Sequence, residues 1–319
     1  MSDEARETAA VGGQAQAGDS LATARVLAVA ATLVHLALIA ACGRLRWDYL
    51  VLDGLLAAFA LGGARTAALL RAGLPLWITV VLYLDVQGLL LPLRGTILTG
   101  DLFRLDAALF PAPGEAPLPW PAWFATRTHV VADVLASLAY GLFVVPFFGA
   151  LFVYVFVEPE RARAMAWSFF AANLLAICCF VLLPAAPPWY VLAYGPGPAD
   201  LAIAPSPAGT ARFDALFGVE LFSDVYSRNP NVFAAIPSLH AAYPLMATWH
   251  LWGRGRGWRV FGVGFTVWVV LSALYLSHHY VVDLLAGLAT GLVSCAVVAW
   301  LRNRPQGSAA RVARSEARG

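Results

Sequence analysis

Long apolar runs dominate this sequence. They lie near residues 26–43, 49–70, 74–93, 129–157, 163–184, 237–252, 258–277 and 280–301. A membrane-spanning helix needs about 20 mostly apolar residues, because its backbone must satisfy its own hydrogen bonds inside the hydrocarbon. Hydrophobic residues make up 60% of the chain and charged residues only 13%, which sets it apart from soluble globular proteins. The sequence therefore predicts an all-α, polytopic membrane helix bundle with about eight transmembrane helices.

Arginine placement predicts the orientation of the bundle. The tail at residues 302–319 contains Arg302, Arg304, Arg311, Arg314 and Arg318. Short cytoplasmic segments carry an excess of positive residues, so this tail is expected in the cytoplasm. Counting spans back from it places the loops at Arg161 and Arg254, and the N-terminal tail, on the same side. The long connections at 94–128 and 185–236, rich in Pro, Gly and aromatic residues, then fall on the outer side.

The chain divides into four predicted parts. Residues 1–24 are polar and predicted to form a disordered cytoplasmic tail. Residues 25–94 hold the N-terminal transmembrane helices, residues 95–301 hold the candidate chemistry, and residues 302–319 form the basic cytoplasmic tail. A net charge of +2 is too small to indicate a nucleic-acid partner. The four cysteines lie inside apolar runs and show neither a disulfide framework nor metal-ligand spacing.

Three histidines are expected at the outer ends of their helices. They are His240, His278 and His279, and their side of the membrane follows from the arginines alone. The sequence therefore predicts one site that contains all three.

The segment before His240 has the features of a phosphate cradle. Pro237 suits the first turn of a helix, whose unpaired backbone N–H groups attract anions. The hydroxyl of Ser238 and the guanidinium of Arg228 are predicted to add hydrogen bonds to a phosphate. The alternative is an ordinary helix start with an interfacial histidine.

His279 and Asp283 are four residues apart, so a helix places them on one face. A carboxylate there can fix the imidazole tautomer and stabilise the cation formed when the other ring nitrogen attacks. We expect His279 to attack phosphorus and His240 to exchange a proton with the departing and accepting groups. This mechanism needs no metal and no cofactor. A purely structural His–Asp pair is the alternative.

Other polar residues and functions are weighed against this site. His129 and Asp133 are also four apart, and structural polar packing is the prediction for them, as it is for His35. A haem-binding electron carrier would use histidines as axial ligands, but it leaves Asp283 and the cradle unexplained. A transporter would show repeated halves with broken helices, and the sequence shows no such repeat.

The motifs resemble those of the type 2 phosphatidic acid phosphatase superfamily, and more narrowly its inositol phosphorylceramide synthase-like branch. The resemblance covers Pro184–Trp189, Ile236–His240 and His278–Asp283. It implies a six-helix catalytic core within residues 95–301. It also implies that His279 is the nucleophile, Asp283 its orienting partner and His240 the acid/base.

The same resemblance assigns substrate binding to Ser238, and we add Arg228 and His278. Two phosphate-binding motifs of the phosphatase branch are absent: a Lys separated by six residues from an Arg-Pro pair, and a Ser-Arg pair, which is Ser272–Ala273 here. These departures favour the synthase-like branch over simple phosphatidate hydrolysis.

The expected function is that of a membrane lipid phosphotransferase acting through a phosphohistidine on a phospholipid or polyprenyl-phosphate lipid. A lipid phosphate phosphatase that uses water is the alternative. The expected partners are a membrane lipid and a polar alcohol acceptor. A composition typical of GC-rich bacterial genomes argues against ceramide as that acceptor. The expected location is the cell membrane, with the active site on the extracytoplasmic face.

Overall fold

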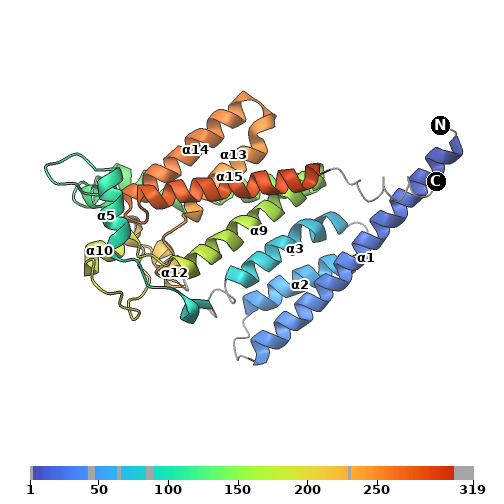
Figure 1. Ribbon diagram of the computed structural model, residues 1–319, viewed down its shortest axis with the longest axis horizontal. Coiled ribbons are helices and arrows are strands. Elements are labelled where there is room, and N and C mark those ends of the chain that lie inside the picture. Colours follow the sequence, from blue (N-terminus) through green and yellow to red (C-terminus); the bar gives the residue numbers. More distant parts are fainter. Residues whose placement is uncertain (1–2, 42–46, 63–65, 84–89, 229–230, 305–319) are drawn as a thin grey trace, which may run out of the picture. The chain divides into compact units, whose positions relative to one another are not determined.

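The computed structural model describes residues 3–41, 47–62, 66–83, 90–228 and 231–304. Within these ranges the chain is helical and forms no β-strand (Figure 1). Five helical segments are long and apolar enough to cross a membrane: Leu21–Ala41, Val130–Val157, Pro159–Leu182, Arg256–Tyr275 and Val281–Asn303. Many of their leucine, valine and phenylalanine side chains are exposed, as expected for helices in contact with lipid. The predicted all-α membrane bundle is confirmed.

The chain forms two compact units. One contains residues Met1–Val86 and Leu151–Phe170, and the other contains Gln87–Ala150 and Ala171–Gly319.

The first unit contains three N-terminal helices: α1 (Asp3–Ala41), α2 (Trp47–Leu61) and α3 (Ala67–Val81). Their shared core consists of Ala28, Leu56, Ala60, Leu70 and Trp77. The predicted boundary between the runs 49–70 and 74–93 is wrong, because α2 ends at Leu61 and α3 already begins at Ala67. The sequence Gly62–Gly63 follows α2, and glycine disfavours helix continuation. Helix α1 also starts at Asp3, within the tail predicted to be disordered, and its alanine-rich sequence favours helix.

Buried polar side chains join the three N-terminal helices. His35 Nδ1 lies 2.9 Å from Asp53 Oδ2, and Trp77 Nε1 donates a 2.7 Å hydrogen bond to Asp53 Oδ1. The rings of Tyr49 and Trp77 each meet the His35 ring edge-on, with centroids 5.4 Å apart. An ionisable group in a membrane helix needs such partners. The prediction of structural packing for His35 is confirmed.

The second unit contains most of the remaining membrane helices. Helices α7 (Val130–Gly141) and α8 (Val145–Val157) follow one another across a short turn and correspond to the run predicted at 129–157. The other helices are α9 (Pro159–Leu182), α13 (Leu239–Leu251), α14 (Arg256–Tyr275) and α15 (Val281–Asn303). The first residues of α9 and the last of α8 belong to the first unit. Helix α13 packs against both α14 and α15 (Figure 1).

Shorter helices lie in the two long connections between the membrane helices. They are α5 (Gly100–Leu109), α6 (Trp120–Ala125), α10 (Pro188–Tyr194), α11 (Ala211–Phe217) and α12 (Leu221–Ser227), with a 3-10 turn at Ala208–Thr210. Two further 3-10 turns lie at Leu91–Leu93, before the first connection, and at Trp252–Arg254, between α13 and α14. Ala185 forms isolated β-bridges with both Leu98 and Ala234. These bridges tie the two connections to the segment that leads into α13.

Small residues let α13 and α15 approach closely. A Cβ atom added to Gly287 of α15 would lie 2.0 Å from the Ser238 carbonyl oxygen, and one added to Gly291 would lie 3.0 Å from the Ala242 oxygen. Real Cβ atoms do not approach an oxygen to 2.0 Å, so only glycine fits opposite Ser238. This contact brings the start of α13 against the first turns of α15.

Candidate active site

The structure brings the three predicted histidines together at adjacent helix ends. His240 is in the first turn of α13, and His278 and His279 fill the turn between α14 and α15. His279 Nε2 lies 3.3 Å from His240 Nδ1. Both His278 and His279 are buried, at 4% and 7% exposure. The three histidines therefore form one cluster, as a single site would require.

Asp283, in the first turn of α15, lies beside His279, which is in the turn just before that helix. Its Oδ2 lies 3.3 Å from His279 Nδ1, and the carboxylate is fully buried. A buried carboxylate at this position favours the tautomer with a proton on Nδ1. The lone pair of Nε2 is then available to attack an electrophile.

Tyrosine rings stack on the histidines. The Tyr140 ring lies parallel to that of His240, with centroids 4.1 Å apart, and to that of His278 at 4.5 Å. Tyr140 Oη is 3.3 Å from His240 Nδ1 and accepts a 2.9 Å hydrogen bond from Tyr226 Oη. Sequence reasoning did not predict Tyr140 or Tyr226. A hydroxyl-bearing ring inside the apolar run 129–157 was the signal for Tyr140, because such a hydroxyl needs a partner.

His278 is held as a neutral ring. Its Nε2 lies 3.1 Å from the Pro207 carbonyl oxygen, which can only accept, so Nε2 carries the proton. Burial, followed by the nearby His279, lowers the pKa of His278 to about 3. The remaining nitrogen, Nδ1, is then a hydrogen-bond acceptor.

Ser238 immediately precedes α13. The helix begins at Leu239, so Pro237 lies before the first turn rather than in it. The Ser238 backbone N–H donates to the Asp283 carbonyl at 3.0 Å. Its hydroxyl is buried and has no hydrogen-bond partner among the described residues. A ligand oxygen can therefore supply the missing partner.

Arg228 ends α12 and its side chain is exposed. The structure records no contact between Arg228 and the histidine cluster within the described ranges. Its predicted role in phosphate binding stays a prediction.

A different arginine lies beside the cluster, and sequence reasoning missed it. Arg212 of α11 donates from Nε to Asp133 Oδ1 at 2.7 Å, and its guanidinium lies over the Tyr275 ring at 5.4 Å. Tyr275 Oη donates to the same Asp133 oxygen at 2.7 Å. Asp133 therefore pairs with these groups, while His129 caps α7 by accepting from the Val131 N–H. The available signal was Asp133 itself, a carboxylate within an apolar run that needs a cation.

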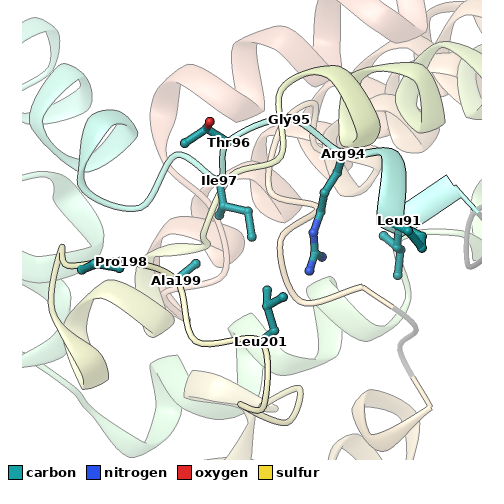
Figure 2. A pocket seen from close by; sticks show the side chains of 9 residues that line it. Leu91, Arg94, Gly95, Thr96, Ile97, Pro198, Ala199 and Leu201 are labelled. Carbon is teal, nitrogen blue, oxygen red and sulfur yellow. The ribbon is translucent and has the colours of Figure 1, made fainter.

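A cavity of about 430 Å³ lies in the same unit but contains none of the predicted site residues. It is lined by Leu91, Pro92, Arg94, Gly95, Thr96, Ile97, Pro198, Ala199 and Leu201. Figure 2 shows the Arg94 side chain extending between Ile97 and Leu91, with its guanidinium end toward Leu201. The Arg94 guanidinium also lies 5.6 Å from the centroid of the Phe233 ring. This cavity is therefore distinct from the histidine cluster.

Comparisons of the sequence with known proteins identify its family. The model of the PAP2 superfamily matches residues 102–297, which include every residue of the histidine cluster. No solved structure gave a significant match.

Curated relatives share the same region. The chain is 34% identical over 286 residues to the phosphoinositol dihydroceramide synthase of Bacteroides thetaiotaomicron, covering 84% of this chain and 87% of that protein. It is 35% identical over 191 residues to the inositol phosphorylceramide synthase catalytic subunit of Schizosaccharomyces pombe, covering 59% of this chain and 45% of that one. The Saccharomyces cerevisiae subunit of the same name is 36% identical over 165 residues, 51% of this chain and 41% of that protein. These relatives are named as synthases rather than phosphatases. By its family-model match and its 34% identity to a relative covered almost end to end, the chain belongs to the PAP2 superfamily.

Proposed function

We propose that this chain is a lipid phosphotransferase that moves a phosphoinositol head group from a phospholipid to an alcohol. The observation that carries the proposal is the line of contacts from Asp283 through His279 to His240, at 3.3 Å for each step. The names of the relatives, which specify phosphoinositol and inositol phosphorylceramide, support this head group. They favour a transferase over a phosphatase.

In the first step, His279 Nε2 attacks phosphorus while the bond from phosphorus to the diacylglycerol oxygen breaks. Asp283 stabilises the positive charge that develops on the ring, through the proton on Nδ1. His240 donates a proton to the departing oxygen. The product of this step is a phosphohistidine that carries the inositol.

In the second step, His240 removes the proton from the acceptor hydroxyl. The acceptor oxygen forms a bond to phosphorus as the phosphorus–nitrogen bond breaks, and His279 returns to its neutral state. The 3.3 Å contact between His279 Nε2 and His240 Nδ1 leaves no room for phosphorus. The His240 ring must therefore turn away from His279 when the donor binds.

Three further residues are proposed to bind the substrate. The unpartnered Ser238 hydroxyl suits a phosphate oxygen, and the exposed Arg228 offers positive charge. The neutral His278 has an acceptor nitrogen, which suits a hydroxyl of the head group better than a phosphate oxygen. The proposed steps use no metal ion and no cofactor.

A lipid alcohol is the proposed acceptor, and ceramide-type alcohols now belong among the candidates. The amino-acid composition, typical of a GC-rich bacterial genome, argues against them, but the Bacteroides thetaiotaomicron relative is bacterial and is named for dihydroceramide. We further propose that the protein lies in the cell membrane with this site on the extracytoplasmic face, as the arginine distribution predicts.

The test uses purified protein in detergent with lipids labelled in the phosphate group. Phosphatidylinositol, phosphatidate and a polyprenyl phosphate would each be supplied with and without dihydroceramide, and His279→Ala would serve as the control. We expect labelled phosphoinositol product from phosphatidylinositol only when the alcohol is present. Release of water-soluble phosphate without acceptor would instead establish a phosphatase. Activity that required added magnesium and ended with a chelator would refute the metal-free steps.

A further inference from the structure

Arg212 has an unused hydrogen-bonding group beside the histidine cluster. Its Nε is committed to Asp133, but its Nη2 is shielded from solvent and has no acceptor among the described residues. A buried donor without an acceptor costs about 1–3 kcal/mol, and more when it is charged. A ligand that brings an oxygen to this position would remove that cost.

The backbone next to the histidines fixes the place of Arg212. The Gly209 N–H donates to the Leu276 carbonyl at 2.9 Å, and a Cβ on Gly209 would lie 2.7 Å from the Leu276 backbone. The neighbouring Pro207 carbonyl accepts from His278. These contacts hold the start of α11 against the turn that contains His278 and His279.

The side chain of Arg212 is held in a fixed orientation. Asp133 binds its Nε, and the Tyr275 ring lies under the guanidinium plane at 5.4 Å. The side chain as a whole is 33% exposed although Nη2 itself is covered, so a ligand approaches the guanidinium from its exposed side. The positive charge also contributes to the lowered pKa of His278, which agrees with its position at the cluster.

We propose that Arg212 binds the phosphate of the donor lipid through its terminal nitrogens. This inference rests on the proposed function and deepens it. A phosphodiester carries one negative charge, and attack by His279 shifts further charge onto its non-bridging oxygens. A pre-positioned guanidinium stabilises that charge. The phosphatase branch has an arginine at the position of Ala273, and this chain lacks it. Arg212, about 60 residues upstream, would supply a guanidinium in its place.

The first experiment measures kcat and KM for the labelled phosphoinositol donor in Arg212→Gln. We expect kcat/KM to fall by about 100- to 1000-fold, mostly through kcat. The kcat/KM of Arg212→Lys should lie between those of wild type and Arg212→Gln, because lysine keeps the positive charge but not the planar guanidinium. Added guanidinium ion should restore part of the activity of Arg212→Ala and none of that of His279→Ala.

Arg161→Gln is the matched control. Arg161 also pairs with a carboxylate, that of Glu158, and lies over a ring, that of Tyr154 at 5.2 Å. It is 36% exposed, and it belongs to the other unit. Its replacement should leave both kinetic constants within about twofold of wild type, a margin set by the small net value of exposed ion pairs. Equal losses in both variants would overturn the proposal.

Orthovanadate binding tests the role of Arg212 independently of the proposed lipid substrate. Vanadate adopts the five-coordinate geometry of a phosphoryl-transfer transition state, and such analogues bind tightly to a matching site. We expect wild type to bind vanadate and Arg212→Gln to lose most of that affinity, whatever the true donor lipid. Vanadate affinity that survives in a folded Arg212→Gln protein would refute the assignment. If Arg212→Gln does not fold, Arg212→Lys is measured in the same way, and a vanadate affinity equal to that of wild type would refute the assignment.

Discussion

The proposed chemistry depends on which nitrogen of each histidine carries a proton. Asp283 Oδ2 faces His279 Nδ1 at 3.3 Å, and His279 Nε2 faces His240 Nδ1 at the same distance. A carboxylate only accepts hydrogen bonds, so it selects the tautomer that leaves Nε2 unprotonated. The stacked Tyr140 ring and its hydroxyl then hold His240 beside that nitrogen.

Asp283→Asn tests this tautomer selection. The amide can donate to Nδ1, so it permits the tautomer that protonates Nε2 and blocks attack. By analogy with catalytic triads, we expect kcat to fall by about 10³- to 10⁴-fold, with KM for the donor little changed. Steady-state kinetics on labelled donor would measure both constants. An unchanged kcat would mean that Asp283 has only a structural role.

The start of α15 is held from two sides, and both contacts determine where His279 lies. Ser238 N–H donates to the Asp283 carbonyl, and the Val282 N–H donates to Asp106 Oδ1 of α5 at 2.9 Å. The close approach of α13 at Gly287 completes this arrangement. The catalytic geometry is therefore a property of helix packing as much as of the histidines.

Gly287→Ala should disrupt the α13–α15 contact. The new methyl group would meet the Ser238 carbonyl at 2.0 Å, so one helix must shift. We expect a loss of about 1–3 kcal/mol in stability and a marked fall in kcat, because Ser238 and His240 move with α13. Thermal unfolding and kinetics on the same preparation would measure both.

Gly264→Ala provides the control for that change. Gly264 is also within a helix, α14, but a Cβ there meets nothing within 4 Å. It should be neutral or slightly stabilising. A Gly287→Ala protein as active and stable as Gly264→Ala would show that the close contact is not needed.

The Asp106 contact should make stability depend on pH. Burial raises the pKa of Asp106 to about 6, above its ordinary value of 3.8, with Asp283 adding to the effect and the Val282 N–H opposing it. The folded protein therefore holds this proton more tightly than the unfolded chain. The stabilisation is complete below about pH 4 and is lost as the pH rises through about 6. Melting temperatures from pH 4 to 7 should fall more steeply for wild type than for Asp106→Asn, and parallel curves would contradict this.

Local sequence patterns predicted the membrane helices and one pair of site residues. The features that the sequence did not predict depend mostly on contacts between distant segments. The pairing of His279 with Asp283 followed from a four-residue spacing, and the membrane helices followed from apolar runs. The Arg212–Asp133 pair joins residues that are 79 apart and lie in different helices, α11 and α7, so no spacing rule could reveal it. The division between α2 and α3 was missed because the apolar run continues past Leu61, where α2 ends.

The N-terminal unit allows its stability to be tested separately from catalysis. In this unit His35 and Asp53 are buried, at 5% and 1% exposure, and Trp77 also donates to Asp53. His35→Leu removes one partner and leaves the buried carboxylate with the Trp77 N–H as its one hydrogen-bond donor among the described residues, which should cost about 3–5 kcal/mol. Replacing both His35 and Asp53 by leucine removes the unpaired charge, so this double variant should unfold at a higher temperature than His35→Leu.

The residues proposed to be catalytic all belong to the other unit, so folded His35→Leu protein should keep the wild-type KM. Its kcat should also match wild type when the rate is divided by the amount of protein whose His279 becomes labelled with donor phosphate. Differential scanning calorimetry in detergent and phosphohistidine trapping would measure the two effects on one sample. If kcat per labelled site fell while the melting temperature stayed constant, the His35–Asp53 pair would act in the reaction itself. A lower melting temperature with constant turnover would establish it as the polar link that joins the N-terminal helices.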